Sequence, residues 1–346
     1  MRPSFIHGLS DIARPQPEAA ILLSVYDFVL TNKLMSMQLI RNVGDEKSPK
    51  YGLTGLLSFS SYLLQHAYRS ARAALYGRLI LIILQLLVED AQMTKRLSET
   101  SSSARLCRQR LPFLPITKGD RPFAVILLDI MIDCINHNLR TKLDVTLYSS
   151  TMGILVRLIS HLSKSRTRMK YHWPELWRSL LSFIRFLTQY AEQLRSIAYI
   201  DTLVCDTVNL LTLCLTQGEM FVPDSDSIDD LFYKIVESSS QLAGFRDAHA
   251  LQRSSAADNM ATLIGAGEHF KQSLQAANGK TKNVSPTEVM KAIKDGYETL
   301  SIGAREGTDQ WHPYREADNK VELKKIARVV AADARLLGLS SEQHAG

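Results

Sequence analysis

Residues 173–191, WPELWRSLLSFIRFLTQYA, decide the fold class of this chain. Their large apolar side chains return every three or four residues, which places them on one face of an α-helix. Pro174 fits the first turn of this helix, where its missing N–H group costs no hydrogen bond. The spacing favours the two tryptophans as core anchors over a cage for a ligand. The apolar face consists of Trp173, Trp177, Leu180, Leu181, Ile184, Leu187 and Ala191.

The same helical period continues along the chain in both directions, and alternation at strand period is scarce. We therefore predict an all-α fold without a sheet. Roughly ten helices joined by short turns are typical of stacked helix pairs, so the expected architecture is an armadillo/HEAT-like helical repeat, an α-solenoid. The main helices are expected near residues 18–41, 52–90 (two helices), 123–138, 142–163, 195–217 and 228–242, with a long surface loop at residues 98–122.

The last hundred residues are more polar than the rest but still helical. Ser285 and Glu288 form a capping box around Pro286. A final apolar stripe, which Gly338 is expected to end as a helix cap, comprises Leu323, Ile326, Val330, Ala334 and Leu337. We predict a flexible N-terminus at residues 1–17, an armadillo-like helical domain at 18–244 and a polar helical region at 245–346.

Composition indicates a folded chain in a reducing compartment. The 346 residues are 45% hydrophobic and 22% charged, and the net charge of +6 is too small to predict a nucleic-acid partner. The four cysteines form no C-x-x-C pair, and three of them, Cys134, Cys205 and Cys214, are expected to act as small hydrophobes in apolar helices. The N-terminus lacks the apolar core of a secretory signal, and the apolar run at residues 79–88 is shorter than the roughly 20 residues that span a bilayer. We therefore expect neither secretion nor a membrane span.

Catalytic and metal-binding patterns find little support in the sequence. Residues 279–281 (GKT) imitate the end of a P-loop, but Leu274 stands where that loop needs glycine. Asp129, Asp133 and His137 are spaced four residues apart and would share one helix face, where they could hold a cation for an undiscovered enzyme. Because metal sites usually take ligands from more than one element, a polar helix edge is favoured. The prediction is a chain that is not an enzyme and needs no cofactor or metal.

A basic stretch at residues 157–172 contains no acidic residue and runs into the tryptophan pair. It could bind anionic lipid head groups, or it could be a solvated loop that caps helix C-termini. The predicted partner- or lipid-binding residues are Arg157, Lys164, Arg166, Arg168, Lys170 and Trp173.

Four segments, residues 50–63, 76–90, 122–136 and 171–181, resemble the C-terminal domain of the armadillo-like helical domain-containing protein 3 family. The resemblance covers residues 18–245, and its fungal members are the most similar in character. It implies a non-enzymatic adaptor in the cytoplasm, peripheral to the Golgi membrane, that supports secretion. The implied partners are a phosphatidylinositol 4-kinase and an Arf guanine-nucleotide exchange factor. Members of the family carry another helical half before this region, and that half has no counterpart here.

Overall fold

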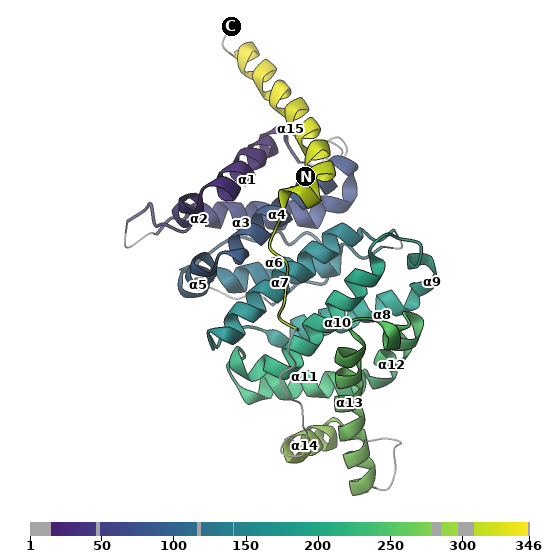
Figure 1. Ribbon diagram of the computed structural model, residues 1–346. Coiled ribbons are helices and arrows are strands. Elements are labelled where there is room, and N and C mark those ends of the chain that lie inside the picture. Colours follow the sequence, from purple (N-terminus) through teal and green to yellow (C-terminus); the bar gives the residue numbers. More distant parts are fainter. Residues whose placement is uncertain are drawn as a thin grey trace, which may run out of the picture. The chain divides into compact units, whose positions relative to one another are not determined.

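A computed structural model describes residues 15–45, 49–115, 119–140, 142–278, 285–296 and 308–344 (Figure 1). These residues form fifteen α-helices and a few 3₁₀ turns, so the predicted all-α fold is confirmed. One departure lies in the predicted loop at residues 98–122. Two-residue strands there, β1 (Ser101–Ser102) and β2 (Arg121–Pro122), pair antiparallel and bring the two ends of the loop together.

The chain divides into two compact units. Unit 1 contains residues 1–138 and 312–346, and unit 2 contains residues 139–311. These bounds differ from the predicted division at residue 245. The reason is packing. α13 (Ala257–Asn278) lies against α10 (Ile200–Gln217), α11 (Ser225–Glu237) and α12 (Ser239–Ala248). The C-terminal helix α15 (Glu316–His344) instead packs against η1 (Pro17–Ala20) and α4 (Ala71–Glu89) of unit 1.

Unit 1 is a cluster of helices closed by the C-terminal helix. α1 packs against α4, while α3 and α5 each pack against α4 and α6. α6 is buried along nearly its whole length. The elements of the unit besides β1, β2 and α15 are η1 (Pro17–Ala20), α1 (Ile21–Thr31), α2 (Lys33–Leu39), α3 (Gly52–His66), η2 (Ala67–Arg69), α4 (Ala71–Glu89), α5 (Ala91–Glu99) and α6 (Phe123–His137).

The helix expected at residues 18–41 is divided at Asn32. The backbone of Asn32 is extended, with φ −134°, and the side-chain oxygen of Asn32 accepts a hydrogen bond of 2.9 Å from the N–H of Leu34. An asparagine side chain that caps a helix in this way competes with continuation of the preceding helix. The chain therefore ends α1 at Thr31 and starts α2 at Lys33.

α4 is the one helix in the described ranges that is long and apolar enough, by length and composition, to cross a membrane. The sequence predicted no span, because its longest apolar run is short. In the structure 61% of the most apolar window of α4 is buried inside the protein. A core helix passes the same test, so the feature is weak support for a span.

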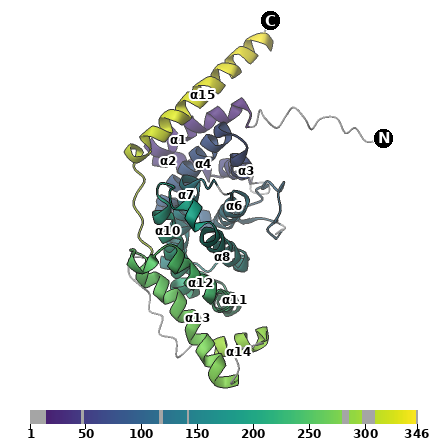
Figure 2. The same cartoon turned by 90° about the vertical axis from the view of Figure 1, so that its right-hand side faces the viewer.

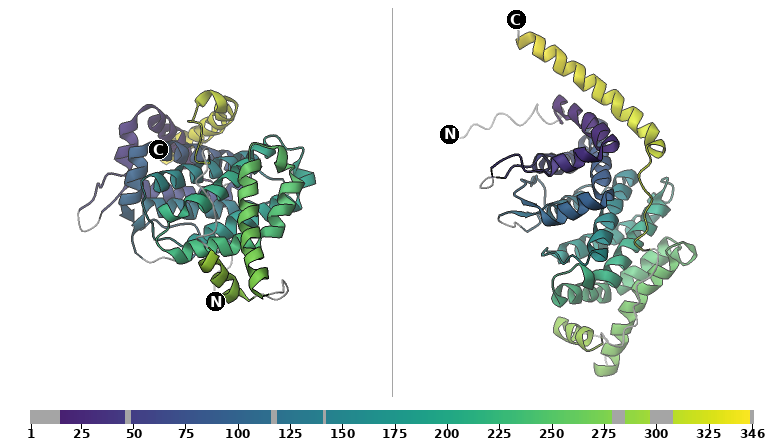
Figure 3. Two further views of the ribbon diagram at one scale, coloured as in Figure 1. Left: turned by 60° about the horizontal axis from the view of Figure 1, so that its bottom comes forward. Right: turned by 60° about the vertical axis from the view of Figure 1, so that its left-hand side comes forward.

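Unit 2 follows the same packing logic. α7 packs against α10, α8 contacts α10, α11 and α12, and α14 lies beside α11 and α13 (Figure 3). The apolar face predicted from residues 173–191 lines this core, where Trp173 and Trp177 are both fully buried. The elements of the unit besides α10–α13 are α7 (Val145–Lys164), α8 (Trp173–Gln189), α9 (Ala191–Leu194), η3 (Gly218–Met220), η4 (Leu251–Arg253) and α14 (Pro286–Gly296).

The capping box at the start of α14 is confirmed. The N–H of Ser285 donates to the Glu288 carboxylate at 2.8 Å, and the N–H of Glu288 donates to the Ser285 hydroxyl at 3.3 Å. The expected end of α15 at Gly338 is wrong, because the helix continues to His344. Figures 1 and 2 show the C-terminal end of α15 extending away from the other helices of unit 1.

α15 is attached to unit 1 through a polar contact that the predicted apolar stripe did not include. The carboxylate of Asp333 is buried, accepts a hydrogen bond of 2.6 Å from the Tyr76 hydroxyl and pairs with Arg72 at 2.7 Å. Ile326 and Val330 are buried as expected, but Ala334 is exposed and Leu323 and Leu337 are not buried. The docked face of α15 is thus narrower than the apolar stripe.

Candidate functional site

The basic connector, residues 164–170, joins α7 to α8 and begins with a regular helix ending. The N–H of Thr167 donates to the carbonyl of Leu162 at 2.9 Å, and the N–H of Arg166 donates to that of Ser163 at 3.0 Å. Arg166 has φ 50°, in the left-handed region. These two bonds and this conformation define a Schellman motif, which directs the chain out of α7 at a fixed angle.

Met169 fixes the middle of the basic connector to the core of unit 2. Its side chain is buried, and its N–H donates to the carbonyl of Phe221 at 2.8 Å. Its own carbonyl accepts a hydrogen bond of 3.0 Å from the indole N–H of Trp173. The residues on either side of Met169, Arg168 and Lys170, are exposed.

Four of the six predicted binding residues therefore lie on the surface: Lys164, Arg166, Arg168 and Lys170. The other two do not. Trp173 is fully buried, where it stacks on Trp177 with ring centroids 5.7 Å apart. Arg157 is only 6% exposed. Neither side chain is available to a partner or a lipid in this conformation, so their inclusion in the candidate surface is corrected.

Arg157 is covered by residues 308–311, a segment of unit 2 that ends with the aromatic ring of Trp311. The guanidinium carbon of Arg157 lies 4.6 Å from the centroid of that ring, a cation–π distance. Two turns further along α7, the amine of Lys164 lies 2.7 Å from the Asp309 carboxylate. The segment thus contacts two basic residues of α7.

A carboxylate of α10 completes the surroundings of Arg157. Burial raises the pKa of Asp206 to about 6, and the nearby positive charge of Arg157 opposes that shift. Arg157 also donates a hydrogen bond of 2.9 Å to the carbonyl of Gly153. Arg157 is therefore a structural cation of unit 2 as long as residues 308–311 cover it.

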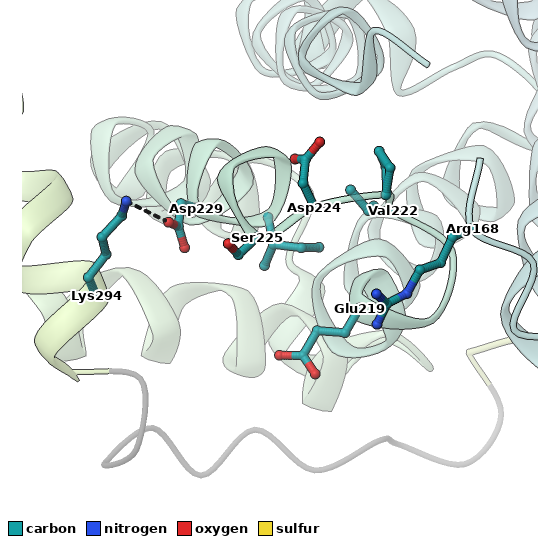
Figure 4. A pocket seen from close by; sticks show the side chains of 9 residues that line it. Arg168, Glu219, Val222, Asp224, Ser225, Asp229 and Lys294 are labelled. Atoms are coloured by element: carbon teal, nitrogen blue, oxygen red, sulfur yellow. Dashed lines mark ion pairs between the residues drawn. The ribbon is translucent and has the colours of Figure 1, made fainter. Parts of the chain in front are cut away.

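Arg168 borders an open pocket of about 590 Å³ at the start of α11 (Figure 4). Lys294 of α14 reaches Asp229 on the other side of the pocket, at 3.6 Å. Burial raises the pKa of Asp229, and Lys294 opposes the shift. The remaining charged side chains of the pocket are the carboxylates of Glu219 and Asp224. With three carboxylates against two cations, the pocket does not favour an anion, and Arg168 has acidic neighbours on that side.

The candidate cation group on α6 is occupied by internal contacts. Asp129 is fully buried and forms an ion pair with Arg121, and the ring Nε2 of His137 lies 3.2 Å from the Pro112 carbonyl oxygen. Burial, with help from the Asp129 charge and against that of Arg108, raises the pKa of Asp133 to about 7. Within the described ranges, no cluster of three or more His, Cys, Asp or Glu side chains is arranged to hold a metal. Asp129, Asp133 and His137 thus form a polar edge of α6, as the sequence favoured, and this edge is buried against residues of the 98–122 loop.

The four cysteines, all within the described residues, are free thiols. Cys134 and Cys214 are buried and Cys107 and Cys205 half-buried, and burial raises the pKa of the Cys214 thiol. The glycine-lysine turn at residues 279–281 lies outside the described residues.

Sequence reasoning missed Asp309 and Trp311, the two residues that contact α7. Neither stands in a periodic helical pattern, and both lie far along the chain from their partners. The absence of acidic residues in the basic stretch was the only signal that a carboxylate from elsewhere could pair with it.

A model of the C-terminal domain of armadillo-like helical domain-containing protein 3 matches residues 121–336, more than half of the chain. The chain belongs to this family. The family and the all-helical fold are those of a helical scaffold, and the resemblance noted in the sequence is confirmed.

Curated members of the family are about a quarter identical to the chain over the aligned residues. A fission-yeast protein named as a UPF0588 membrane protein is 27% identical over 325 residues, which is 92% of this chain and 52% of that protein. The human and Xenopus laevis armadillo-like helical domain-containing proteins 3 are each 26% identical over 305 residues, 82% of this chain and 44% of theirs. The chain thus spans about half the length of these relatives. No solved structure matches it.

Proposed function

We propose that this chain is a non-enzymatic helical adaptor, cytoplasmic and peripheral to the Golgi membrane, that binds protein partners there. In this role it supports secretory trafficking and production of phosphatidylinositol 4-phosphate. The observation that carries the proposal is the family match over residues 121–336. Stacked amphipathic helices suit the role, because such folds present extended surfaces to other proteins. The proposed partners are a phosphatidylinositol 4-kinase and an Arf guanine-nucleotide exchange factor, and no cofactor is involved.

Affinity purification of the tagged chain, followed by mass spectrometry at low and high salt, tests this proposal. We expect one or both of the two named enzymes to be recovered, and the tagged chain to colocalise with a Golgi marker in cells. Recovery of neither enzyme, together with a diffuse distribution in the cell, would contradict the adaptor function.

The second proposed function is binding to an anionic membrane surface through the basic connector. It is favoured by four exposed basic side chains within seven residues, Lys164, Arg166, Arg168 and Lys170. Each such side chain contributes up to about 1 kcal/mol near an anionic surface. The binding should weaken with salt, because the screening length is about 10 Å at 0.1 M and shorter above it.

Flotation with vesicles of phosphatidylcholine alone, or with added phosphatidylserine, tests this surface. We expect wild-type protein to float only with the anionic vesicles, and the triple change Arg166→Glu, Arg168→Glu and Lys170→Glu to abolish flotation. The matched control reverses three basic residues elsewhere in unit 2: Arg195, Arg253 and Lys271. Equal losses in both triple variants would show a net-charge effect and remove the basic connector from the function.

A further inference from the structure

Residues 308–311, here called the masking segment, lie on the face of α7 that leads into the basic connector. Arg157 and Lys164 are seven residues apart, so they share one face of the helix over two turns. Asp309 contacts Lys164 at 2.7 Å and Trp311 covers Arg157 at 4.6 Å. Thr308, which precedes them, is buried at 1% exposure, so the segment is enclosed at its start.

The contacts of the masking segment imitate those of an anionic ligand. A carboxylate neutralises Lys164, as a lipid phosphate or carboxylate would, and an indole ring takes the place of solvent over Arg157. Without the segment, Lys164 would lose the Asp309 carboxylate, and Arg157 would be uncovered while keeping its contacts with Gly153 and Asp206. The positive surface of Arg166, Arg168 and Lys170 would then extend onto the last two turns of α7.

We propose that residues 308–311 form an intramolecular mask that competes with an anionic membrane surface for Arg157 and Lys164. In the masked state the surface presents the residues of the basic connector, with Lys164 paired. In the open state Lys164 is no longer paired with Asp309, and Arg157 is uncovered while still beside Asp206. The inference rests on the proposed membrane contact and adds its regulation: the anionic surface displaces the masking segment and in return gains the charge of Lys164 and access to Arg157.

The ion pair and the cation–π contact are weak enough for this exchange. Half-exposed ion pairs such as that of Lys164, whose side chain is 64% exposed, are held loosely and screened by salt. Lys164 near an anionic surface is expected to raise affinity about 5-fold, and Arg157, which Asp206 partly neutralises, adds a smaller factor. Removing the mask by substitution should release part of that gain.

Two substitutions separate unmasking from a simple change of charge. Trp311→Ala leaves the net charge unchanged, and Asp309→Asn removes the partner of Lys164. We expect each to raise binding to phosphatidylserine vesicles several-fold at 0.1 M salt, and the double variant to raise it further. The matched controls are Tyr199→Ala, which removes an aromatic ring that is 78% exposed elsewhere in unit 2, and Asp247→Asn, which removes an exposed carboxylate. Both controls should change binding less than twofold.

A carbodiimide cross-link reports the mask directly in the full chain. This reagent joins an amine to a carboxylate in direct contact, so the free protein should give a Lys164–Asp309 cross-link. The Lys294–Asp229 pair, at 3.6 Å in the same unit, is the internal reference. Phosphatidylserine vesicles should lower the yield of the first cross-link and leave the second unchanged, whereas phosphatidylcholine vesicles should change neither.

The outcomes separate the mask from the membrane contact on which it rests. If charge reversal of the basic connector abolishes binding but Trp311→Ala and Asp309→Asn bind like wild type, the mask is wrong and the membrane contact stands. A Lys164–Asp309 cross-link that persists on vesicle-bound protein also overturns the mask. If neither wild type nor the double variant binds anionic vesicles, both proposals fall.

Discussion

Arg166 holds a backbone conformation, φ 50°, that glycine adopts at much lower cost than other residues. It does so because the Schellman motif at the end of α7 needs a left-handed residue at this position. An arginine at this position makes the folded protein less stable than a glycine would, and it places a positive charge at the tip of the basic connector. The residue is more easily explained by the surface it supplies than by the fold.

Replacing Arg166 by glycine should therefore leave the protein as stable as before, or stabilise it by up to about 1 kcal/mol. Urea unfolding followed by circular dichroism measures this. Lys170→Gly is the matched control, because Lys170 is exposed and its φ is not in the left-handed region. It should gain nothing and lose a few tenths of a kcal/mol. A larger loss in Arg166→Gly than in Lys170→Gly would contradict this account of the turn.

Asp133 makes stability depend on pH. Its folded pKa of about 7 lies above its ordinary value of 3.8, so the folded state binds its proton more tightly than the unfolded state. The stability from this group is complete below about pH 4 and is lost as pH rises through 7. Asp133→Asn, which stays neutral, should flatten the pH profile between 4 and 8 and be the more stable protein at pH 8. Chemical unfolding across this range gives the profile.

The control for Asp133 is Asp120→Asn, since Asp120 is exposed in the same unit. It should keep the wild-type slope. If Asp133→Asn also kept that slope, the Asp133 carboxylate would be ionised throughout, held by Arg108.

At the scale of elements, α15 is a long helix whose docking includes one buried carboxylate, that of Asp333. Asp333 serves both Arg72 and Tyr76 of α4, residues at least 257 positions away in sequence. Nearer its start, Glu322 pairs with Arg78, and just before the helix the N–H of Tyr314 donates to Glu89 at 2.9 Å. Four contacts with one helix fix α15 along α4.

Asp333→Asn should loosen α15 more than it destabilises the rest of unit 1. The change leaves the partly buried Arg72 without its counter-charge, at a cost of about 1–3 kcal/mol. Hydrogen–deuterium exchange should rise across α15 while α6 stays protected. Asp318→Asn, an exposed acid in the first turn of α15, should cost only a few tenths of a kcal/mol. Uniform loss of protection throughout unit 1 would show that α15 is not a separable element.

These elements show where prediction from the sequence reaches its limit. The helices themselves are readable, because Trp173, Trp177 and their neighbours repeat at a local helical period. The docked face of α15 cannot be predicted from the sequence. Asp333 stands among apolar residues and would be assigned to the solvent-facing side, because its partner Arg72 is distant in the sequence. The same holds for the candidate surface: exposure of Arg166 and Lys170 follows from local polarity, whereas burial of Arg157 depends on Trp311.

For the whole molecule, the division into units follows from long-range closure. Unit 1 takes its last helix from the C-terminal end, so its two parts flank unit 2 in the sequence. No local change in composition marks that arrangement, which is why the division predicted from polarity lies at residue 245. The matched family region, residues 121–336, also crosses the bounds of both units.

Residues 139–311 expressed alone should fold, since they contain the complete set of helices that pack in unit 2. We expect a helical circular dichroism spectrum and one cooperative thermal transition. A fragment of residues 121–336 should be less stable and unfold less cooperatively. In it α6 lacks its contacts with α3 and α5, and α15 lacks its contacts with η1 and α4. The fragment should bind a hydrophobic dye. If residues 121–336 folded cooperatively and residues 139–311 did not, the two units would not be independent.

The discontinuity of unit 1 has a consequence for how the protein is made. On the ribosome α4 is synthesised before unit 2, and α15 is synthesised after it. At about 5–20 residues per second, the intervening chain takes about ten to forty-five seconds to appear. During that interval the side chains of α4 that receive α15 lack their contacts with that helix, and unit 2 has time to fold first. Newly made unit 1 is thus a folding intermediate that lacks α15. The face of α4 that α15 later covers is exposed in this intermediate and is the surface that chaperones would bind.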